Sequence, residues 1–491
     1  MLDKIKKTGK NTAIYGIGNV LNKSLGLILI PFVQQFIPIE EYGWLTLIEL
    51  IILALSSTIV LGITNGHERF FYNEKNNGSY GSFLFSNTLT LFAISLITLT
   101  VLALFSAQIS LSIFKSIDYQ SAIILALIIT FFEVNNIIPF QVLQYEEKAT
   151  QYIVANSIRL FVSLFASILL LSHFDLGIMG VLYGRLIGSG GFALYQFIST
   201  ILPRLKYRFN IQKVKMTISY GFPMIFSGIG YILFSMSDRF MLSQFSSPEE
   251  TGKYSFGYKI AFLVMIIVQS VGVGYLPSFY QQEKAENNSR YYRKMLTYFS
   301  FSMSYLILAF LFTYKPLLKP LITNQDYWAG LNIVPILSLG FVIMGMNYFS
   351  NAGIILKNKT KLLVIPTFIA ALLNITLIYF SIPVFGYVGP AISTFLSQTV
   401  YVGLIAIISN KLMKINFEWT KVFLSVFIAI LFFIIGEYLI TQSVILIIVI
   451  RTFLLLLYPF ILYKLNFFEA IEIERLIQLK EKVKKTTRFG K

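Results

Sequence analysis

Ten ionisable side chains interrupt the long apolar runs of this sequence, and they are the side chains with which it could do chemistry. A charged side chain at the centre of a bilayer costs at least ~2.5–3.5 kcal/mol, so such residues face protein or water and mark functional sites. Six are basic and four are acidic, which leaves a surplus of two positive charges. The pattern therefore predicts an intramembrane site for an anionic ligand. The basic residues are Lys23, Arg159, Arg185, Arg239, Lys259 and Arg451, and the acidic residues are Glu49, Glu133, Asp238 and Glu437.

Lys23, Arg159 and Arg185 are the first candidates to bind such a ligand. Lys23 lies near the middle of the first predicted span with two asparagines beside it, and we expect it to line a cavity. Arg159 and Arg185, on the fifth and sixth predicted spans, leave two interpretations open. Either they bind the ligand, or they make a structural pair with Glu133.

Two further pairs of charges lie toward the predicted outer surface. Asp238 and Arg239 come near the end of the seventh span, where a local ion pair or snorkelling explains them as well as a ligand does. Lys259 lies one turn into the eighth span, and Glu49 lies at a similar depth in the second. These two could pair across the halves of the molecule and form an outer gate. The sequence thus predicts gate or ion-coupling roles for Glu49, Glu133, Asp238 and Arg239.

The remaining polar residues indicate neither an enzyme nor a metalloprotein. Glu437 and Arg451 lie in the last two spans, and we expect them to bond each other. The segment His67-Glu68-Arg69 is interpreted as a solvated turn, because one histidine and one glutamate are too few ligands for a metal. The chain has no cysteine and two histidines. It also has no phosphate-binding loop or dinucleotide fingerprint, so we expect no cofactor.

The composition identifies the elements that must carry these residues as membrane helices. Of the 491 residues, 56% are hydrophobic and only 13% are charged, and the mean hydropathy is +0.71. A soluble globule is not this apolar. The net charge of +17 does not indicate a nucleic-acid-binding protein, because the basic residues lie in loops on one side of the predicted membrane. The basic N-terminus has no cleavage site and predicts a retained first helix.

The apolar runs predict fourteen spans of about 20 residues or more. With the N-terminus in the cytoplasm, 30 of the 40 Lys and Arg residues fall on the inner side, 4 on the outer side and 6 within spans. This asymmetry follows the positive-inside rule and predicts an even number of spans with both termini cytoplasmic. The predicted ranges are 11–37, 44–66, 82–105, 119–143, 150–172, 177–201, 217–243, 254–277, 296–314, 329–354, 361–381, 386–409, 419–440 and 443–464.

An internal repeat organises these spans. The segment 35–43 returns 209 residues later as 244–252, with Gln, Phe, Glu, Glu and Gly in register. Both copies are predicted to be outer loops, in Pro38–Gly43 and Ser247–Gly252. Six spans separate the repeat starts, so the two halves enter the membrane in the same direction. The same offset relates Lys4, Lys6, Thr8, Phe70, Glu74 and Lys75 to Lys213, Lys215, Thr217, Phe279, Glu283 and Lys284.

The repeat and the spans predict an all-α membrane protein of two parallel six-helix lobes with two extra helices. Seven prolines inside the spans predict a bundle with bent helices. The last segment is predicted to be a basic amphipathic helix on the anionic cytoplasmic leaflet. The predicted parts are residues 1–209 and 210–418 for the lobes, 419–464 for spans 13 and 14, and 465–491 for the tail.

Short motifs in this order resemble a known family. They are Glu40-Glu41-Tyr42-Gly43, Arg69-Phe70-Phe71, Asp238-Arg239-Phe240-Met241-Leu242 and Gly252-Lys253-Tyr254-Ser255. With the fourteen-span layout, residues 1 to about 460 resemble the polysaccharide transporters of the multidrug/oligosaccharidyl-lipid/polysaccharide exporter superfamily, which include the O-antigen flippases. The family has arginine in some relatives where this chain has Lys23, a departure that weakens the expectation of bidentate phosphate binding there.

The resemblance implies a flippase with a bundle like that of the multidrug and toxin extrusion transporters. Such proteins move an undecaprenyl-pyrophosphate-linked oligosaccharide, a unit of O-antigen, capsule or exopolysaccharide, from the inner to the outer leaflet of the bacterial cytoplasmic membrane. They work by alternating access through a cationic cavity. A polysaccharide polymerase and a chain-length regulator of the same pathway are the implied protein partners, and nucleic acid is not a partner. We expect Lys23, Arg159, Arg185 and Lys259 to bind the pyrophosphate and anionic sugars.

Three other functions stay open from the sequence. A cation-coupled multidrug exporter of the same superfamily would favour intramembrane acids without a cationic surplus. A lipid II flippase differs in whether deletion is lethal or only strips the surface glycan. A polysaccharide polymerase or ligase, the more remote alternative, would show a large outer loop with Arg and His and no repeat.

Overall fold

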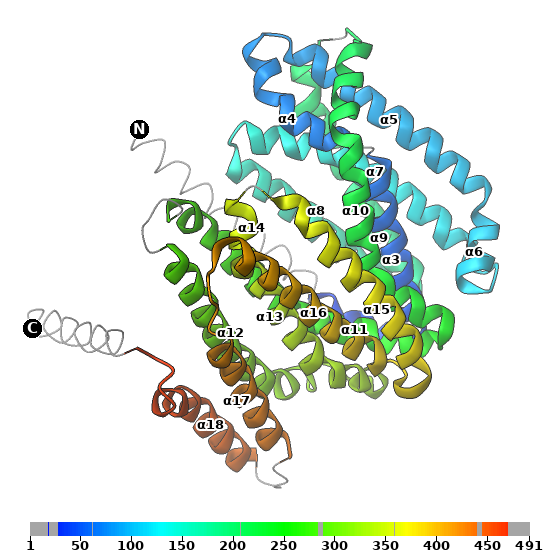
Figure 1. The fold of residues 1–491 in the computed structure, drawn as a ribbon. Coiled ribbons are helices and arrows are strands. Elements are labelled where there is room, and N and C mark those ends of the chain that lie inside the picture. Colours follow the sequence, from blue (N-terminus) through cyan, green and yellow to red (C-terminus); the bar gives the residue numbers. More distant parts are fainter. Residues whose placement is uncertain are drawn as a thin grey trace, which may run out of the picture. The chain divides into compact units, whose positions relative to one another are not determined.

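All the regular secondary structure in the part of the chain that the structure describes is helical (Figure 1). The structure is a computed structural model. It describes residues 28–60, 62–206, 208–282, 288–357, 359–438 and 444–469, together with Gly18. The predicted cavity residue Lys23 and residues 470–491 of the predicted tail lie outside these ranges. No strand occurs within them, which agrees with the predicted fold class.

Twelve helices in the described ranges are long and apolar enough to cross a membrane. Each of them overlaps one of the predicted spans, from Ile39–Ile59, which overlaps 44–66, to Ile445–Lys464, which overlaps 443–464. The other two predicted spans, 11–37 and 217–243, include residues that are not described in full. The sequence therefore located each membrane helix that can be compared, although not always its ends.

The described helices follow one another along the chain with short connections. They are α2 (Ile30–Phe36), α3 (Ile39–Ile59), α4 (Ile63–Asn76), α5 (Tyr80–Leu104), α6 (Ser106–Phe114), α7 (Gln120–Tyr145), α8 (Ala149–Phe174), α9 (Gly177–Gln196), η1 (Phe197–Ile201), η2 (Leu202–Arg204), α10 (Ile211–Phe245), α11 (Pro248–Gln281), α12 (Asn288–Leu318), η3 (Gln325–Ile333), α13 (Val334–Ser350), α14 (Ala352–Leu356), η4 (Thr360–Leu363), α15 (Val364–Phe385), α16 (Val388–Met413), α17 (Trp419–Tyr438) and α18 (Val444–Lys464).

The repeated segment is not a loop, and this part of the prediction was wrong. Ile39–Gly43 forms the first turns of α3, and Pro248–Gly252 forms those of α11. In both copies two glutamates occupy the first helical turn, where negative side chains favour the positive end of the helix dipole. A proline precedes α3 and begins α11, because a missing N–H costs nothing there.

The second predicted span also ends earlier than expected, because the helix breaks near Gly62. Gly62 has a φ of +71°, a left-handed conformation that a glycine adopts without a steric penalty. Helix α4 then runs on with a more polar surface to Asn76. The break separates the apolar helix α3 from the polar helix α4.

The chain is divided into two compact units. The first comprises Met1–Ser270, Leu321–Gly340 and Ile365–Tyr401, and the second comprises Val271–Pro320, Phe341–Val364 and Val402–Lys491. All the contacts described below lie within one of these units. The lobe boundaries that the repeat suggests stay a prediction.

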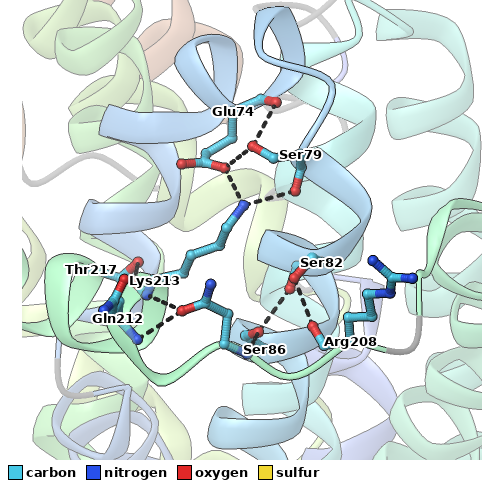
Figure 2. Close-up of polar contacts among 9 residues, drawn as sticks. Glu74, Ser79, Ser82, Ser86, Arg208, Gln212, Lys213 and Thr217 are labelled. Atoms are coloured by element: carbon cyan, nitrogen blue, oxygen red, sulfur yellow. Dashed lines mark hydrogen bonds and ion pairs between the residues drawn. The ribbon is translucent and has the colours of Figure 1, made fainter.

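Within the first unit, the connection between the repeats is bonded to α4 and α5, as Figure 2 shows. Lys213 Nζ lies 2.5 Å from Glu74 Oε2 and donates to the carbonyl of Ser79 at 3.0 Å. Ser82 Oγ donates to the carbonyl of Arg208 at 2.6 Å. Ser86 Oγ in turn accepts from the backbone N–H of residue 210 at 2.9 Å. These bonds attach the start of α10 to the first repeat.

Glycines close the packing of α3 and α4 against α10 and α11 at two places in the first unit. A Cβ on Gly43 would overlap the carbonyl of Pro248, and one on Gly252 would overlap that of Ile39. At the other end of α3, Gly62 and Gly221 approach each other in the same way. The two copies of the repeated segment are therefore in backbone contact.

In the second unit, α12, α17 and α18 lie side by side around an apolar core (Figure 1). Phe312, Phe432 and Tyr458 are among its buried residues. At one end of this group, Lys294 contacts Glu418 at 3.1 Å and Glu469 at 2.5 Å. The latter bond fixes the first residues after α18.

Candidate functional site

Six of the eight predicted cavity and gate residues line one cavity in the first unit. The cavity has a volume of about 460 Å³. Helix α3 contributes Glu49, α7 contributes Glu133, and α8 and α9 contribute one arginine each, while α10 and α11 add one basic residue each. These six are Glu49, Glu133, Arg159, Arg185, Arg239 and Lys259. Residues separated by up to 210 positions in the chain are thus brought together.

Arg185 and Glu133 form a bidentate ion pair between α9 and α7. Arg185 Nε donates to Glu133 Oε1 at 2.8 Å, and Nη2 donates to Oε2 at 3.1 Å. The parallel donors match the carboxylate geometry. The pair predicted as one of two interpretations is therefore present, and it faces the cavity rather than being sealed away from it.

Arg159 has no such carboxylate partner among the described residues. It donates from Nη2 to Asn156 Oδ1 at 3.0 Å, and its guanidinium lies 5.8 Å from the centre of the Phe140 ring. Its buried Nε has no hydrogen-bond partner in the described part of the chain. Leaving a buried charged donor unbonded is costly. Arg159 therefore presents an unsatisfied cationic donor to the cavity.

Arg239 and Asp238 lie near the end of α10 and point to different partners. The guanidinium of Arg239 lies 3.7 Å from the centre of the Tyr258 ring, a cation–π contact, and its buried Nε is unbonded. Asp238 is buried. It accepts from the hydroxyl of Tyr254 and from the backbone N–H of Arg239. Asp238 thus fixes the α10–α11 contact while Arg239 lines the cavity.

Lys259 and Glu49 line the same cavity and a smaller one of about 290 Å³ beside it. The Nζ of Lys259 lies 5.7 Å from the centre of the Tyr42 ring. Within the described ranges no ion pair joins Glu49 to Lys259, although both face the same space. Tyr42 belongs to the repeated segment, so the cavity lies directly beside the first contact between the repeats.

The charges of the main cavity sum to plus two. Four basic side chains face two carboxylates, and one of these carboxylates is already bonded to Arg185. In an apolar surrounding, such groups interact strongly with an anion. A ligand with two or more negative charges would therefore neutralise the cavity.

Sequence reasoning missed the aromatic and hydroxyl groups of this site. Tyr42 and Tyr258 position or cover basic side chains, and Thr46 and Ser163 line the main cavity. Their positions in the sequence could have indicated them, because Tyr258 directly precedes Lys259 and Thr46 follows Tyr42 by one helical turn.

Glu437 and Arg451 belong to the second unit, as part of a separate cluster. Arg451 Nη2 lies 3.3 Å from Glu437 Oε2, which confirms their predicted bond. Lys315 also contacts Glu437, and Arg451 donates to the carbonyl of Phe312 at 3.0 Å. The cluster connects α12, α17 and α18. In the described part of the chain, no three His, Asp or Glu side chains gather closely enough to hold a metal ion.

Comparison with known families gives two matches. A model described as "Polysaccharide biosynthesis protein" matches residues 8–281, more than half of the 491 residues. A second model, MatE, matches residues 223–380. A comparison with curated protein sequences gave no match.

Solved structures with the same fold include transporters of several kinds. The lipid II flippase MurJ in an inward closed conformation has a TM-score of 0.71 at 17% identity, covering 92% of this chain and 99% of that one. An inward-facing multidrug resistance MATE transporter of the MOP superfamily gives 0.63 at 14%, covering 82% and 94%. A MOP superfamily transporter from Pyrococcus furiosus, titled for the reverse polarity of its binding pocket, gives 0.57 at 13%, covering 83% and 96%. These likenesses establish the fold.

Proposed function

Since this chain belongs to the polysaccharide biosynthesis protein family of the MOP exporter superfamily, we propose that it is a flippase for an undecaprenyl-pyrophosphate-linked oligosaccharide. It is a multi-pass membrane transporter. In the proposed reaction it moves the lipid-linked glycan from the inner to the outer leaflet of the bacterial cytoplasmic membrane, with both of its own termini in the cytoplasm. No covalent step is required of the protein.

The observation that carries this proposal is the positive surplus in the main cavity. Inside the membrane, a pyrophosphate needs several cationic donors to replace the hydrogen bonds that water gives it outside. Here Arg159 has a buried donor without a partner among the described residues. A drug exporter for cations would need the opposite balance of charge. The lipid tail stays in the bilayer, so the cavity has to accept only the headgroup and the sugars.

Each of the charged residues has a distinct part in this proposal. Arg159, Lys259 and Arg239 bind the pyrophosphate and anionic sugars. Arg185, held by Glu133, supplies the guanidinium N–H donors that are not bonded to the Glu133 carboxylate. Lys23 keeps its proposed cavity role from the sequence, and Glu49 is the proposed gate or coupling acid beside Lys259.

The proposed substrate reaches this flippase from a glycosyltransferase pathway and leaves it for a polymerase. Such a polymerase and a chain-length regulator are the proposed protein partners. The glycan would then be a unit of O-antigen, capsule or exopolysaccharide.

The test is the double substitution Arg159→Gln and Lys259→Gln. It removes two of the four cavity cations and should abolish surface polysaccharide while the protein stays in the membrane at its normal level. Glycan is measured on whole cells, and protein is measured by immunoblot of the membrane fraction. Normal glycan in the double variant would overturn the proposal.

A matched control is Arg208→Gln, which makes the same change at an exposed arginine between η2 and α10. It should leave the glycan unchanged. Deletion of the gene separates the remaining functions. Loss of viability would indicate a lipid II flippase, and drug sensitivity with intact glycan would indicate a multidrug exporter.

A further inference from the structure

A second cavity in the first unit has a polar mouth and an apolar wall. It has a volume of about 780 Å³ and lies where α7 ends, α8 begins and α9 passes into η1. This size is in the range of ordinary ligand sites. By the predicted topology, this end of the three helices lies at the inner membrane surface, where the predicted inner loops carry most of the basic residues.

The polar mouth contains a buried amide whose nitrogen has no partner among the described residues. Gln196, the last residue of α9, is 1% exposed, and its Oε1 accepts from the hydroxyl of Thr200 at 2.6 Å. Its Nε2 has no hydrogen-bond partner among the residues that the structure describes. A buried amide donor of this kind costs free energy unless a ligand satisfies it. The π-helical turn η1 follows at once, a distortion that recurs at functional sites.

Two cations frame the same mouth. Arg204 donates from Nε and Nη2 to Glu146 at 2.8 and 2.7 Å and from Nη1 to the carbonyl of Thr200 at 2.6 Å. Lys148 Nζ lies 2.7 Å from the same carboxylate. A guanidinium has five N–H donors and an ammonium has three. Each therefore keeps about two donors for a further acceptor, and the three side chains together carry one positive charge.

The start of α8 adds backbone donors to this mouth. Lys148 is its N-cap residue and makes no side-chain cap bond, so its side chain satisfies none of the first backbone N–H groups, and Gln151 on this turn lines the cavity. The N-terminus of a 26-residue helix favours negative charge. With Gln196, these donors form a cradle for a group rich in oxygen and negative charge.

Much of the remaining lining of the cavity is apolar. Leu143, Val154, Ile158, Phe192 and Tyr195 line it. An inorganic anion would leave this wall without a contact, whereas a hydrocarbon chain would cover it. The site thus fits an amphiphile with an anionic head.

We propose that this cavity binds the phosphate headgroup of a lipid, with the head at Gln196, Lys148 and Arg204 and the adjoining hydrocarbon chain against α8 and α9. Two lipids share this chemistry. One is the polyprenyl pyrophosphate carrier, and the other is an anionic glycerophospholipid of the membrane. Only the first of these sources rests on the proposed function.

The same two helices connect this site to the main cavity. On α8, Ile158 lines this second cavity, the lower site, and Arg159 lines the main cavity. On α9, Gln196 lines the lower site and Ser189 lines the main cavity. Phe140 lies between them, stacked on Phe192 and under the Arg159 guanidinium. A phosphate held at the lower site is therefore separated from the unsatisfied Arg159 by aromatic rings.

The experiment measures lipid binding by the purified full-length protein in detergent, by native mass spectrometry. The probes are farnesyl pyrophosphate and phosphatidylglycerol, with phosphatidylcholine as the neutral comparison. The variants are Gln196→Glu, which replaces the donor with a carboxylate of equal size, and Lys148→Gln, which changes an accessible residue. We expect an apparent Kd for the bound probe that is at least about tenfold weaker in each variant, as for the loss of one hydrogen bond to a charged group.

The matched control is Lys215→Gln, an exposed lysine of α10 that lines neither cavity. It should bind both probes as the unchanged protein does. Equal binding in Lys148→Gln and in this control would overturn the proposal, even if Gln196→Glu failed to fold. Weaker binding of both lipids in the variants supports a general anionic lipid site, and weaker binding of farnesyl pyrophosphate alone supports a carrier site.

The outcome is independent of the test of the main cavity. A lower site that binds phosphatidylglycerol stands even if Arg159→Gln with Lys259→Gln leaves the surface glycan intact. Loss of glycan in that double variant, with unaltered lipid binding in Lys148→Gln, would support the proposed function and contradict the proposed lower site.

Discussion

At the scale of single residues, the arginines of the first unit differ in how completely they are bonded. Arg185 has its carboxylate within 3.1 Å, whereas Arg159 has one amide oxygen and an aromatic ring. A partner carboxylate holds an arginine in place but reduces its pull on a ligand. Arg159 is therefore the residue whose charge is most available for a phosphate, and Arg185 is the one whose position is most secure.

The ion pairs of Glu146 make the stability of the folded protein depend on pH. Its hydrogen bonds to Arg204 and then to Lys148 lower the pKa of the Glu146 carboxyl to about 2 from 4.5. Because this pKa is depressed in the folded protein, the stabilisation is full above about pH 4.5 and is lost as the pH falls toward 2. We expect Glu146→Gln to be less stable than the unchanged protein at pH 6.

The measurement is thermal unfolding of both proteins in detergent from pH 6 down to pH 2. The difference between them should shrink through the window from about 4.5 to about 2. A constant difference over the whole range would contradict the assignment of the stabilisation to the ionised carboxylate. Asp118→Asn, at an exposed carboxylate, is the control.

At the scale of elements, the decisive feature is that α3 meets α11 through Gly43 and Gly252. Both glycines come from the repeated segment, and both lie in the first turns of their helices. The contact lies beside Tyr42 and thus beside the cavity. We propose that this contact is the outer rim of the cavity, which parts when the substrate is released.

Gly43→Val should hold that rim open. The added side chain would overlap the carbonyl of Pro248, so the helices must separate. The chain has no cysteine, so Thr46→Cys supplies a single reporter in the cavity. We expect an impermeant maleimide added to intact cells to label Thr46→Cys faster with Gly43→Val than without it.

Gly191→Val is the matched control for this comparison. A Cβ on Gly191 meets nothing within 4 Å, so the labelling rate should stay the same. Equal labelling rates in the Gly43→Val and Gly191→Val proteins would show that the contact is not part of the gate.

The sequence predicted the elements better than their ends and contacts. Apolar length alone determines a span, which is why all the comparable spans were found. The break at Gly62 was missed, because a single glycine in an apolar run is common in membrane helices. The bond between Arg185 and Glu133 could be offered only as one of two interpretations, since the partner of a charge depends on how α7 and α9 pack.

At the scale of the whole molecule, the proposed transport moves charge. A pyrophosphate carries roughly two negative charges, and moving them outward across ~100 mV, inside negative, gains on the order of 4–5 kcal/mol. This holds if the protein returns to its starting state without carrying compensating charge. The membrane potential alone could then drive export.

Proteoliposomes with an imposed potassium diffusion potential test this. The rate of flipping of the lipid-linked glycan should rise when the side that receives the glycan is made positive. A rate that does not respond to the potential would exclude this driving force and would favour ion exchange through Glu49 or Glu133.

The glycine contacts between α3 and α11, and between Gly62 and Gly221, have a consequence for the kinetics of opening. Each joins one bare backbone surface to another, so separation at the glycines themselves requires no side chain to change rotamer. Between α4 and α10 the ion pair of Lys213 with Glu74 also has to break. Dispersion attraction of this kind is short-ranged and falls steeply with distance. We therefore expect each contact to be lost over a short separation. We expect the protein to pass between discrete positions at the two ends of α3 rather than along a continuum of partial openings.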